Sequence, residues 1–207
     1  MRIGILGGTF NPIHNGHLYM AFEAKETLEL DRVIFVPNYI PPHKEAYERN
    51  PEDVLKMLEL VLEEYEDFSI STYELEKQGL SYTYETLDYF TKIYPHDELY
   101  FIIGEDSYVN FSRWKNPEII ISLAKLVVFQ RHGFDEHERL RTRTLLETHG
   151  KTPVMLDSMI LEISSSDIRN RVMKNKEIRY LVPEKVRDYI YEHELYRANT
   201  VEQERSP

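Results

Sequence analysis

Short apolar runs alternate with stretches of helical spacing along the whole chain. Branched and aromatic side chains dominate the runs, so we expect strands at residues 3–6, 33–36, 68–72, 99–103, 126–129 and 154–156. Between the runs, helical spacing and helix-start residues predict helices at 14–28, 51–62, 83–93, 135–148, after 164–167 and at 183–193. This alternation predicts an α/β fold, a Rossmann-like parallel sheet with helices on both faces.

Glycine, charged and hydroxyl residues follow several of the predicted strands. They lie at residues 7–8, 41–44, 104–106 and 164–166. Ligands of such sheets bind beyond the carboxyl ends of the strands, where the strand order switches. We therefore expect these four segments to surround one binding site.

Length and charge narrow the class of protein. The 207 residues suit one domain, which we place at 1–197, with a polar tail at 198–207. The absence of cysteine excludes disulfides and thiol catalysis, and there is no apolar run of the roughly 20 residues that span a bilayer. The chain opens directly on a strand, so we expect no leader, no membrane partner and a cytoplasmic location. A net charge of −11 argues against a nucleic-acid partner.

The segment after the first strand predicts a phosphate site. Gly7 and Gly8 form a turn, and His14 and His17 fall in the first turn of the next helix. Glycines allow close approach to a ligand, and free N–H groups at a helix start attract phosphate. The alternatives are a zinc pair or two solvent-facing histidines. Structural zinc needs four ligands, and without cysteine these would have to come from distant positions.

A second segment with phosphate chemistry lies near the C-terminus. Serines at residues 164–166 open a helix, and capping alone would explain one of them. Arg169, expected in the first turn, opposes the helix dipole unless an anion binds there. Asp167 could also simply neutralise Arg169, so this motif alone leaves both interpretations open.

Both segments resemble signatures of the nucleotidylyltransferase superfamily. Residues 9–17 (TFNPIHNGH) resemble its T/G-x-F-x-P-x-H-x-G-H pattern, and residues 163–169 (ISSSDIR) resemble its I-S-S-T/S-x-x-R stretch. Segments 36–44, 81–87, 101–106 with Trp114, and 181–196 extend the similarity to the bacterial nicotinate-nucleotide adenylyltransferases. The resemblance covers nearly the whole chain.

The resemblance implies transfer of AMP from ATP to nicotinate mononucleotide, giving deamido-NAD and pyrophosphate in NAD biosynthesis. Mg²⁺ would accompany ATP without a dedicated protein metal site, and family habit suggests a homodimer. The expected catalytic residues are His14, His17 and Arg169. The remaining ATP-site residues would be Gly7, Gly8, Thr9, Phe10, Gly104, Asp106, Arg131, Ile163, Ser164, Ser165 and Ser166. The acceptor would meet Asn38, His43, Lys44, Thr83, Tyr84 and Trp114, with backbone N–H groups near Thr83 and Tyr84 suited to the nicotinate carboxylate.

Several alternatives stay open at this point. Trp114 could stack on the pyridine ring or only pack in the core, and Arg131 could bind phosphate or lie at the surface. Asp106 suits either a ribose hydroxyl or a water on Mg²⁺. The acceptor could instead be nicotinamide mononucleotide or phosphopantetheine. A non-catalytic nucleotide sensor and a fragment of a class I aminoacyl-tRNA synthetase are further alternatives, the latter weakened by the acidic charge.

Overall fold

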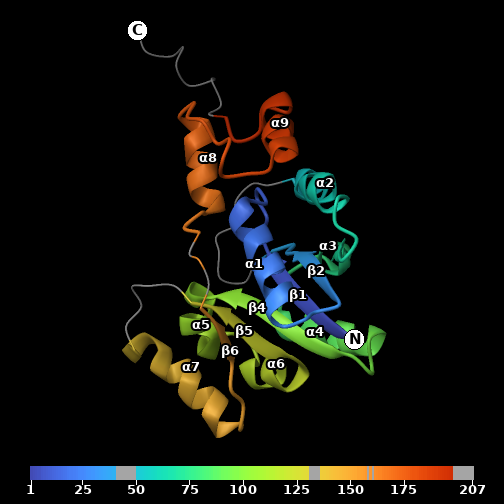
Figure 1. The fold of residues 1–207 in the computed structure, drawn as a ribbon, viewed down its shortest axis with the longest axis vertical. Helices are drawn as coiled ribbons and strands as arrows, with labels where there is room; N and C mark the ends of the chain where they lie inside the picture. The colour runs from blue at the N-terminus through green and yellow to red at the C-terminus, as the bar shows by residue number, and fades with distance from the viewer. Residues whose placement is uncertain (41–49, 131–135, 158, 160, 198–207) are drawn as a thin grey trace.

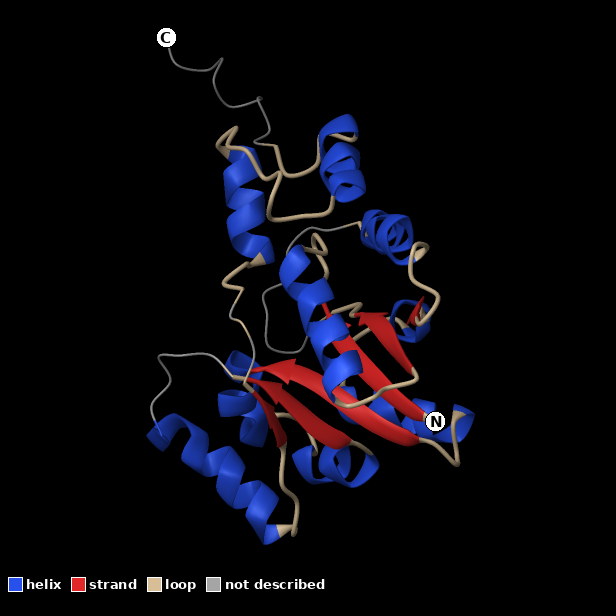
Figure 2. Ribbon diagram, in the orientation of Figure 1, coloured by secondary structure: helices blue, strands red, loops and turns tan. Residues whose placement is uncertain are grey.

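The core of the protein is one parallel sheet. A computed structural model describes residues 1–40, 50–130, 136–157, 159 and 161–197. Its strands are β1 (Arg2–Gly8), β2 (Arg32–Pro37), β3 (Phe68–Ile70), β4 (Glu98–Gly104), β5 (Lys125–Phe129) and β6 (Val154–Leu156). They pair in parallel in the order β3-β2-β1-β4-β5-β6, which confirms the predicted fold class (Figure 2, strands in red). The order reverses between β1 and β4, where such sheets bind ligands.

Helices cover both faces of the sheet and form two apolar cores. On one face lie α1 (Asn15–Thr27), α2 (Pro51–Leu62), α8 (Ser165–Met173) and α9 (Glu184–Glu192). On the other face lie α4 (Thr83–Ile93), α5 (Glu105–Asn110), a 3₁₀ turn at Phe111–Arg113, α6 (Pro117–Leu123) and α7 (Glu136–Thr148). Figure 1 shows α1 across one face of the sheet, with α8 and α9 beyond it and α9 beside α2.

Strand side chains alternate between these two cores. Along β4, Tyr100 and Ile102 join the first core, whereas Leu99, Phe101 and Ile103 join the second. Because both faces are buried, the strands read as continuous apolar runs instead of alternating ones. This is the pattern from which the strands were predicted.

The middle of the chain holds elements that the sequence pattern did not predict. They are α3 (Tyr73–Lys77), α5 and α6, each too short to show two turns of apolar spacing. Thr72 precedes α3 as its N-cap residue, so β3 ends at Ile70 and not at residue 72 as expected. Asn116 and Pro117 open α6 as Asn50 and Pro51 open α2, a signal that could have found it.

The domain boundary and the absence of a membrane-spanning segment can be compared with the described residues only. The predicted tail at 198–207 falls outside the described residues, so the domain boundary stays a prediction. In the described part, no helix combines the length and the apolar character needed to cross a bilayer.

Candidate active site

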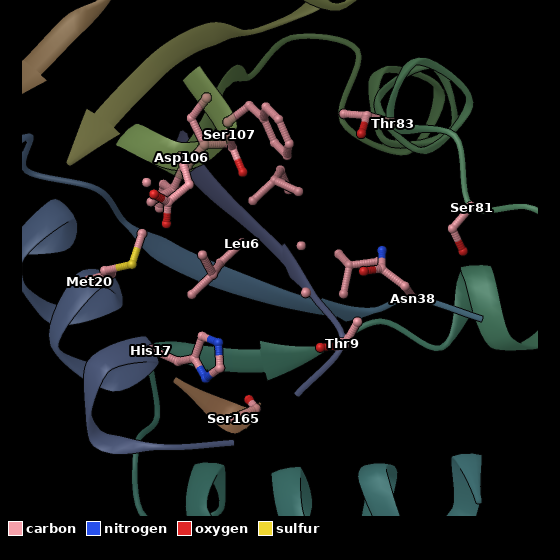
Figure 3. A pocket seen from close by; sticks show the side chains of 18 of the residues that line it. Leu6, Thr9, His17, Met20, Asn38, Ser81, Thr83, Asp106, Ser107 and Ser165 are labelled. Atoms are coloured by element: carbon pink, nitrogen blue, oxygen red, sulfur yellow. The ribbon is translucent and has the colours of Figure 1, made fainter. Parts of the chain in front are cut away.

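A large cavity opens where the strand order reverses. It has a volume of about 1310 Å³, and its walls come from the ends of β1, β2, β4 and β5 and from the starts of α1, α4, α5 and α8. Figure 3 shows side chains from these separate elements, among them His17, Asn38 and Asp106, around the same space. The predicted site residues that line it are Gly7, Gly8, Thr9, His14, His17, Asn38, Thr83, Gly104, Asp106, Trp114, Ile163, Ser164, Ser165, Ser166 and Arg169.

Three predicted site residues lie outside the description. His43 and Lys44 fall within 41–49, and Arg131 falls within 131–135, so their predicted roles remain predictions. The open alternative for Arg131, phosphate contact or surface position, also remains open.

Phe10 does not contribute its side chain to the cavity, and its predicted contact with ATP stays a prediction. The ring is fully buried, packs edge-on against His17 at 4.9 Å between centroids, and lies against Phe35 at 5.7 Å. A Cβ on Gly8 would come within 3.0 Å of this ring, so glycine there makes room for Phe10. Phe10 thus supports the side of the His17 ring. The sequence did not indicate that the Phe10 ring is buried against His17. The backbone of Phe10 has a positive φ of 44°, which is also not apparent from the residue type.

Tyr84 also stays off the cavity wall with its side chain. Its hydroxyl donates to Glu85 Oε1 at 2.9 Å. The predicted contact was through backbone N–H groups, and these lie in the first turn of α4, where Thr83 lines the cavity. The first amide of α4 to bond within the helix is that of Glu85, to Tyr82 O. The helix start therefore has the free-donor character expected of it.

The two histidines cap helix α1 together. His14 is the N-cap residue, its Nδ1 accepts from the His17 backbone N–H at 3.3 Å, and His17 Nδ1 accepts from the His14 backbone N–H at 3.3 Å. The rings stack at 3.6 Å between centroids. Because Nδ1 of each ring is an acceptor, a neutral ring carries its proton on Nε2. Each Nε2–H is then the donor that could meet a phosphate oxygen.

The three-residue spacing of His14 and His17 serves the start of α1 as well as the cavity. His14 is 5 % exposed and serves the helix as well as the cavity, whereas His17 is half-buried. A Cβ on Gly16 would come within 3.1 Å of His14 Nδ1, so the glycine accommodates the stacked rings. The sequence predicted two rings facing one ligand, and both do line the cavity.

The serine motif reaches the histidine motif through hydrogen bonds. Ser164 caps α8, and its Oγ accepts from the Asp167 N–H at 3.1 Å. Ser165 Oγ donates to Pro12 O at 2.9 Å, and Arg169 Nη1 donates to Asn11 O at 2.8 Å. Segments more than 150 residues apart in sequence therefore form one wall of the cavity.

Arg169 lies one turn further into the helix than expected. It is the fifth residue of α8, so the expectation of a first-turn position is wrong. Helical side chains lean toward the N-terminus. The guanidinium accordingly reaches back, and its Nη2 donates to Ser166 Oγ at 3.3 Å. The predicted convergence of the cation and the helix start is retained.

The cavity wall formed by the end of β2, α3 and α4 contains a buried carboxylate that sequence reasoning missed. Glu74, in α3, is 5 % exposed and accepts from Asn38 Nδ2 at 2.8 Å and from Thr86 Oγ1 at 2.5 Å. All three residues line the cavity. The carboxylate thus links the end of β2 to α4 and fixes the Asn38 amide through its nitrogen. Nothing in the local sequence marked Glu74, because α3 itself was not predicted.

The end of β4 supplies Asp106 and, further along, Trp114. Asp106 is exposed in the first turn of α5. Its neighbour Glu105 is fully buried and pairs with Arg139 Nε of α7 at 2.8 Å, which holds α5 in place. Trp114 packs against Phe111 and Phe101 at 5.3 and 6.0 Å and also lines the cavity. It is therefore both a packing residue and a cavity residue.

The described residues do not bring three or more His, Asp or Glu side chains together as a metal cluster. The zinc alternative therefore has no support within residues 1–40, 50–130, 136–157, 159 and 161–197. A divalent ion that arrives with a triphosphate needs few protein ligands, because phosphate oxygens and waters complete its shell. Asp106 is a carboxylate on the cavity wall that suits such an ion.

Comparisons with known proteins agree with this site. The family model described as cytidylyltransferase-like matches residues 5–171. A protein of Clostridium beijerinckii named probable nicotinate-nucleotide adenylyltransferase is 48% identical over 203 residues, which are 95% of this chain and 99% of that protein. A protein of the same name from Clostridium perfringens is 44% identical over 198 residues, or 95% of this chain and 98% of its own.

The chain belongs to the nicotinate-nucleotide adenylyltransferase family. Its members are nucleotidyltransferases, a class that uses ATP and typically needs a divalent metal. Membership confirms the resemblance of the histidine and serine motifs and decides against the phosphopantetheine and synthetase-fragment alternatives.

Solved structures show the same fold. Plasmodium falciparum nicotinic acid mononucleotide adenylyltransferase complexed with APC superposes with a TM-score of 0.74 at 17% identity, covering 94% of this chain and 96% of its own. The same enzyme complexed with NaAD gives a TM-score of 0.74 at 19% identity, covering 94% and 97%. The Rossmann-like nucleotidyltransferase fold of this family thus accommodates such ligands in those proteins.

Proposed function

We propose that the protein transfers AMP from ATP to nicotinate mononucleotide, giving deamido-NAD and pyrophosphate in NAD biosynthesis. The observation that carries the proposal is the contact of the two phosphate-binding motifs, Arg169 to Asn11 and Ser165 to Pro12, around one cavity. The named relatives and the complexes of the P. falciparum enzyme with APC and NaAD support it.

The ATP half of the cavity is the half bounded by α1 and α8. The acceptor phosphate attacks the α-phosphorus of ATP, the bond to the β-phosphate oxygen breaks, and pyrophosphate leaves. Such a transfer needs positioned charge more than a nucleophile on the protein. In this proposal His17 and His14 donate from Nε2 to the α-phosphate, and Arg169 with the start of α8 holds the departing phosphates.

The acceptor half is bounded by β2, α3 and α4. The first-turn N–H groups of α4, at Thr83 and Tyr84, would receive the nicotinate carboxylate. A carboxamide would direct its NH₂ toward some of the same donors, which leaves a polar group unpaired at about 1–3 kcal/mol. Trp114 would stack on the pyridine ring, and Asn38, fixed by Glu74, would contact the ligand with its amide. The roles of His43 and Lys44 on the acceptor phosphate belong to this proposal as well.

Three further features are part of the proposal. We assign Mg²⁺ as the divalent ion, and Asp106 is the side chain best suited to be its protein ligand. When bound, the ion would neutralise the phosphate oxygens of ATP. A homodimer and a cytoplasmic location are also expected for this protein.

The direct test is pyrophosphate release. The protein is incubated with ATP and Mg²⁺ together with nicotinate mononucleotide, nicotinamide mononucleotide or no acceptor. We expect release that depends on the acceptor and is faster with the acid at matched concentration. A preference for the amide would overturn the acid assignment. If neither acceptor causes pyrophosphate release, the result favours the sensor alternative. Cross-linking and sedimentation of the same preparation test the dimer.

A further inference from the structure

The loop that carries the histidine motif is held by the C-terminal part of the chain. Asn15 N–H donates to Leu181 O at 3.0 Å, and Ser165 Oγ donates to Pro12 O. Another contact comes from close to the end of the described chain, where the Tyr196 hydroxyl donates to Asn11 Oδ1 at 2.6 Å. The proposed chemistry gives Tyr196 no role, and Tyr196 does not line the cavity.

Asn11 connects this tyrosine to the phosphate-binding arginine. Asn11 is 5 % exposed, its side-chain oxygen accepts from Tyr196, and its backbone oxygen accepts from Arg169 Nη1 at 2.8 Å. A residue held at both oxygens has little freedom to shift. The position of the Asn11 carbonyl, and with it the direction of the guanidinium, therefore depends on the tyrosine hydroxyl.

Tyr196 is itself rigidly placed. Leu195 and Tyr196 pack against the first apolar core, and the Leu195 N–H donates to Ile190 O at 2.9 Å. A tyrosine ring has only two side-chain torsions, so its hydroxyl is presented at a well-defined point at low entropic cost. This is the property expected of a group that positions another group.

We infer that Tyr196 is a positioning residue for the ATP half of the site, acting through Asn11 on Arg169. The inference rests on the proposed function, which places the ATP phosphates at Arg169, but it does not depend on the identity of the acceptor. It requires that removal of the hydroxyl weakens ATP binding and leaves the acceptor half unchanged, because that half is built from β2, α3 and α4.

The chain offers a matched control in the same segment. Tyr189, in α9, is half-buried like Tyr196, and its hydroxyl donates to Asp53 Oδ1 of α2 at 2.8 Å. Tyr189→Phe removes the hydroxyl that bonds to Asp53, as Tyr196→Phe removes the hydroxyl that bonds to Asn11, but Asn11 lines the cavity and Asp53 does not. A purely structural effect should be similar in both variants.

The experiment compares wild type, Tyr196→Phe and Tyr189→Phe by two readouts. Steady-state kinetics give KM for ATP and for nicotinate mononucleotide, and thermal unfolding gives the rise in Tm on adding ATP alone. We expect Tyr196→Phe to raise the KM for ATP about three- to ten-fold, the range of one lost hydrogen bond. Its KM for the acceptor should stay within about two-fold, and its ATP-dependent rise in Tm should shrink. Tyr189→Phe should leave all three as in wild type.

The results that would overturn the inference differ from those that would overturn the proposed function. Equal KM values for ATP in the two variants overturn the inference, as does a parallel rise of both KM values in Tyr196→Phe. A wild-type protein that releases no pyrophosphate overturns the proposed function instead. In that case the ATP-dependent Tm still tests Tyr196, because it needs no acceptor.

A double-mutant cycle isolates the route through Arg169. In an Arg169→Ala background, Tyr196→Phe should cause no further loss of ATP binding, since the group it positions is gone. Full additivity of the two substitutions would show that the tyrosine acts elsewhere and would overturn the inference.

Discussion

The two ends of the parallel sheet use their polar side chains in opposite ways. At the amino ends, residues from adjacent strands bond to one another: Arg2 Nε donates to the Tyr100 hydroxyl at 3.1 Å, and Lys125 Nζ donates to Glu98 Oε1 at 3.0 Å. The Tyr100 hydroxyl donates to Glu98 Oε2 at 3.0 Å and completes the network. At the carboxyl ends, polar side chains border the cavity, and the contacts run between the loops that carry them.

The two ends differ in where their hydrogen-bonded side chains lie. At the amino ends the hydrogen-bonded residues are also neighbours across adjacent strands, because Arg2 pairs with Glu98 and Tyr100 pairs with Lys125 in the sheet register. The polar side chains there bond to one another. At the carboxyl ends the hydrogen-bonded side chains also border the cavity: His17 accepts at Nδ1 from the His14 N–H, and Asn38 donates from its amide nitrogen to Glu74. The network at the amino ends contributes modestly to stability, whereas the bonds at the carboxyl ends fix the direction of side chains that line the cavity.

The largest effect that this comparison predicts is at His17. Replacement by alanine removes a donor that acts mainly on the transition state. We expect kcat to fall by about two orders of magnitude or more, the range for one lost oxyanion donor, with ATP still bound. Pyrophosphate-release kinetics and the ATP-dependent Tm measure the two parts. Turnover near the wild-type value would remove His17 from the mechanism.

Arg169→Ala is expected to act next most strongly. The substitution removes a charge-assisted contact to phosphate, which corresponds to roughly a ten- to hundred-fold rise in the KM for ATP. The KM for nicotinate mononucleotide should change little, because the proposed acceptor half is built from β2, α3 and α4 and not from α8. Steady-state kinetics at saturating co-substrate measure both values. An unchanged KM for ATP would contradict the anion site at the start of α8.

Apolar periodicity predicted the sheet and the longer helices because buried parallel strands and amphipathic helices leave it in the sequence. Motifs predicted the ATP half, because glycine, histidine and serine gathered at helix starts are typical of phosphate binding. The acceptor half was harder. Glu74 lies on a helix of five residues, which shows no spacing, and its partners Asn38 and Thr86 come from other elements.

Two side-chain directions at the site could not be predicted from the motifs. Phe10 stood inside a phosphate motif but supports His17 from the core, and Arg169 reaches the site from the second turn of α8. Tyr196 contacts Asn11 from 185 positions away. A motif gives the residue types at a site, whereas the direction of each side chain depends on contacts that only the folded chain brings together.

Glu74 tests whether the acceptor half is prepared in the same way as the ATP half. Glu74→Ala leaves the Asn38 amide nitrogen and the Thr86 hydroxyl without their shared acceptor. Two lost bonds to a charged group predict about a ten-fold rise in the KM for nicotinate mononucleotide, with the KM for ATP unchanged. Glu74→Gln is the matched control, since it keeps one acceptor oxygen and the shape, and it should retain most of the affinity. A rise in the KM for ATP of similar size would show general damage to the cavity.

The smallest effect is expected at the amino ends, and it should appear in stability alone. The hydrogen bond from Lys125, and secondly that from Tyr100, lowers the pKa of Glu98 below its ordinary value. A carboxyl whose pKa is lowered by folding stabilises the protein above its unfolded pKa and loses this contribution as the pH falls through its folded pKa. Because Glu98 is 55% exposed, Glu98→Gln should lower Tm at pH 7 by only about 1–3 °C. Plots of Tm against pH from 7 to 3 should converge for wild type and Glu98→Gln below about pH 4. The KM and kcat of Glu98→Gln at pH 7 should equal the wild-type values. A kinetic change in this variant would mean that the two ends of the sheet are coupled, and the division of tasks between them would fail.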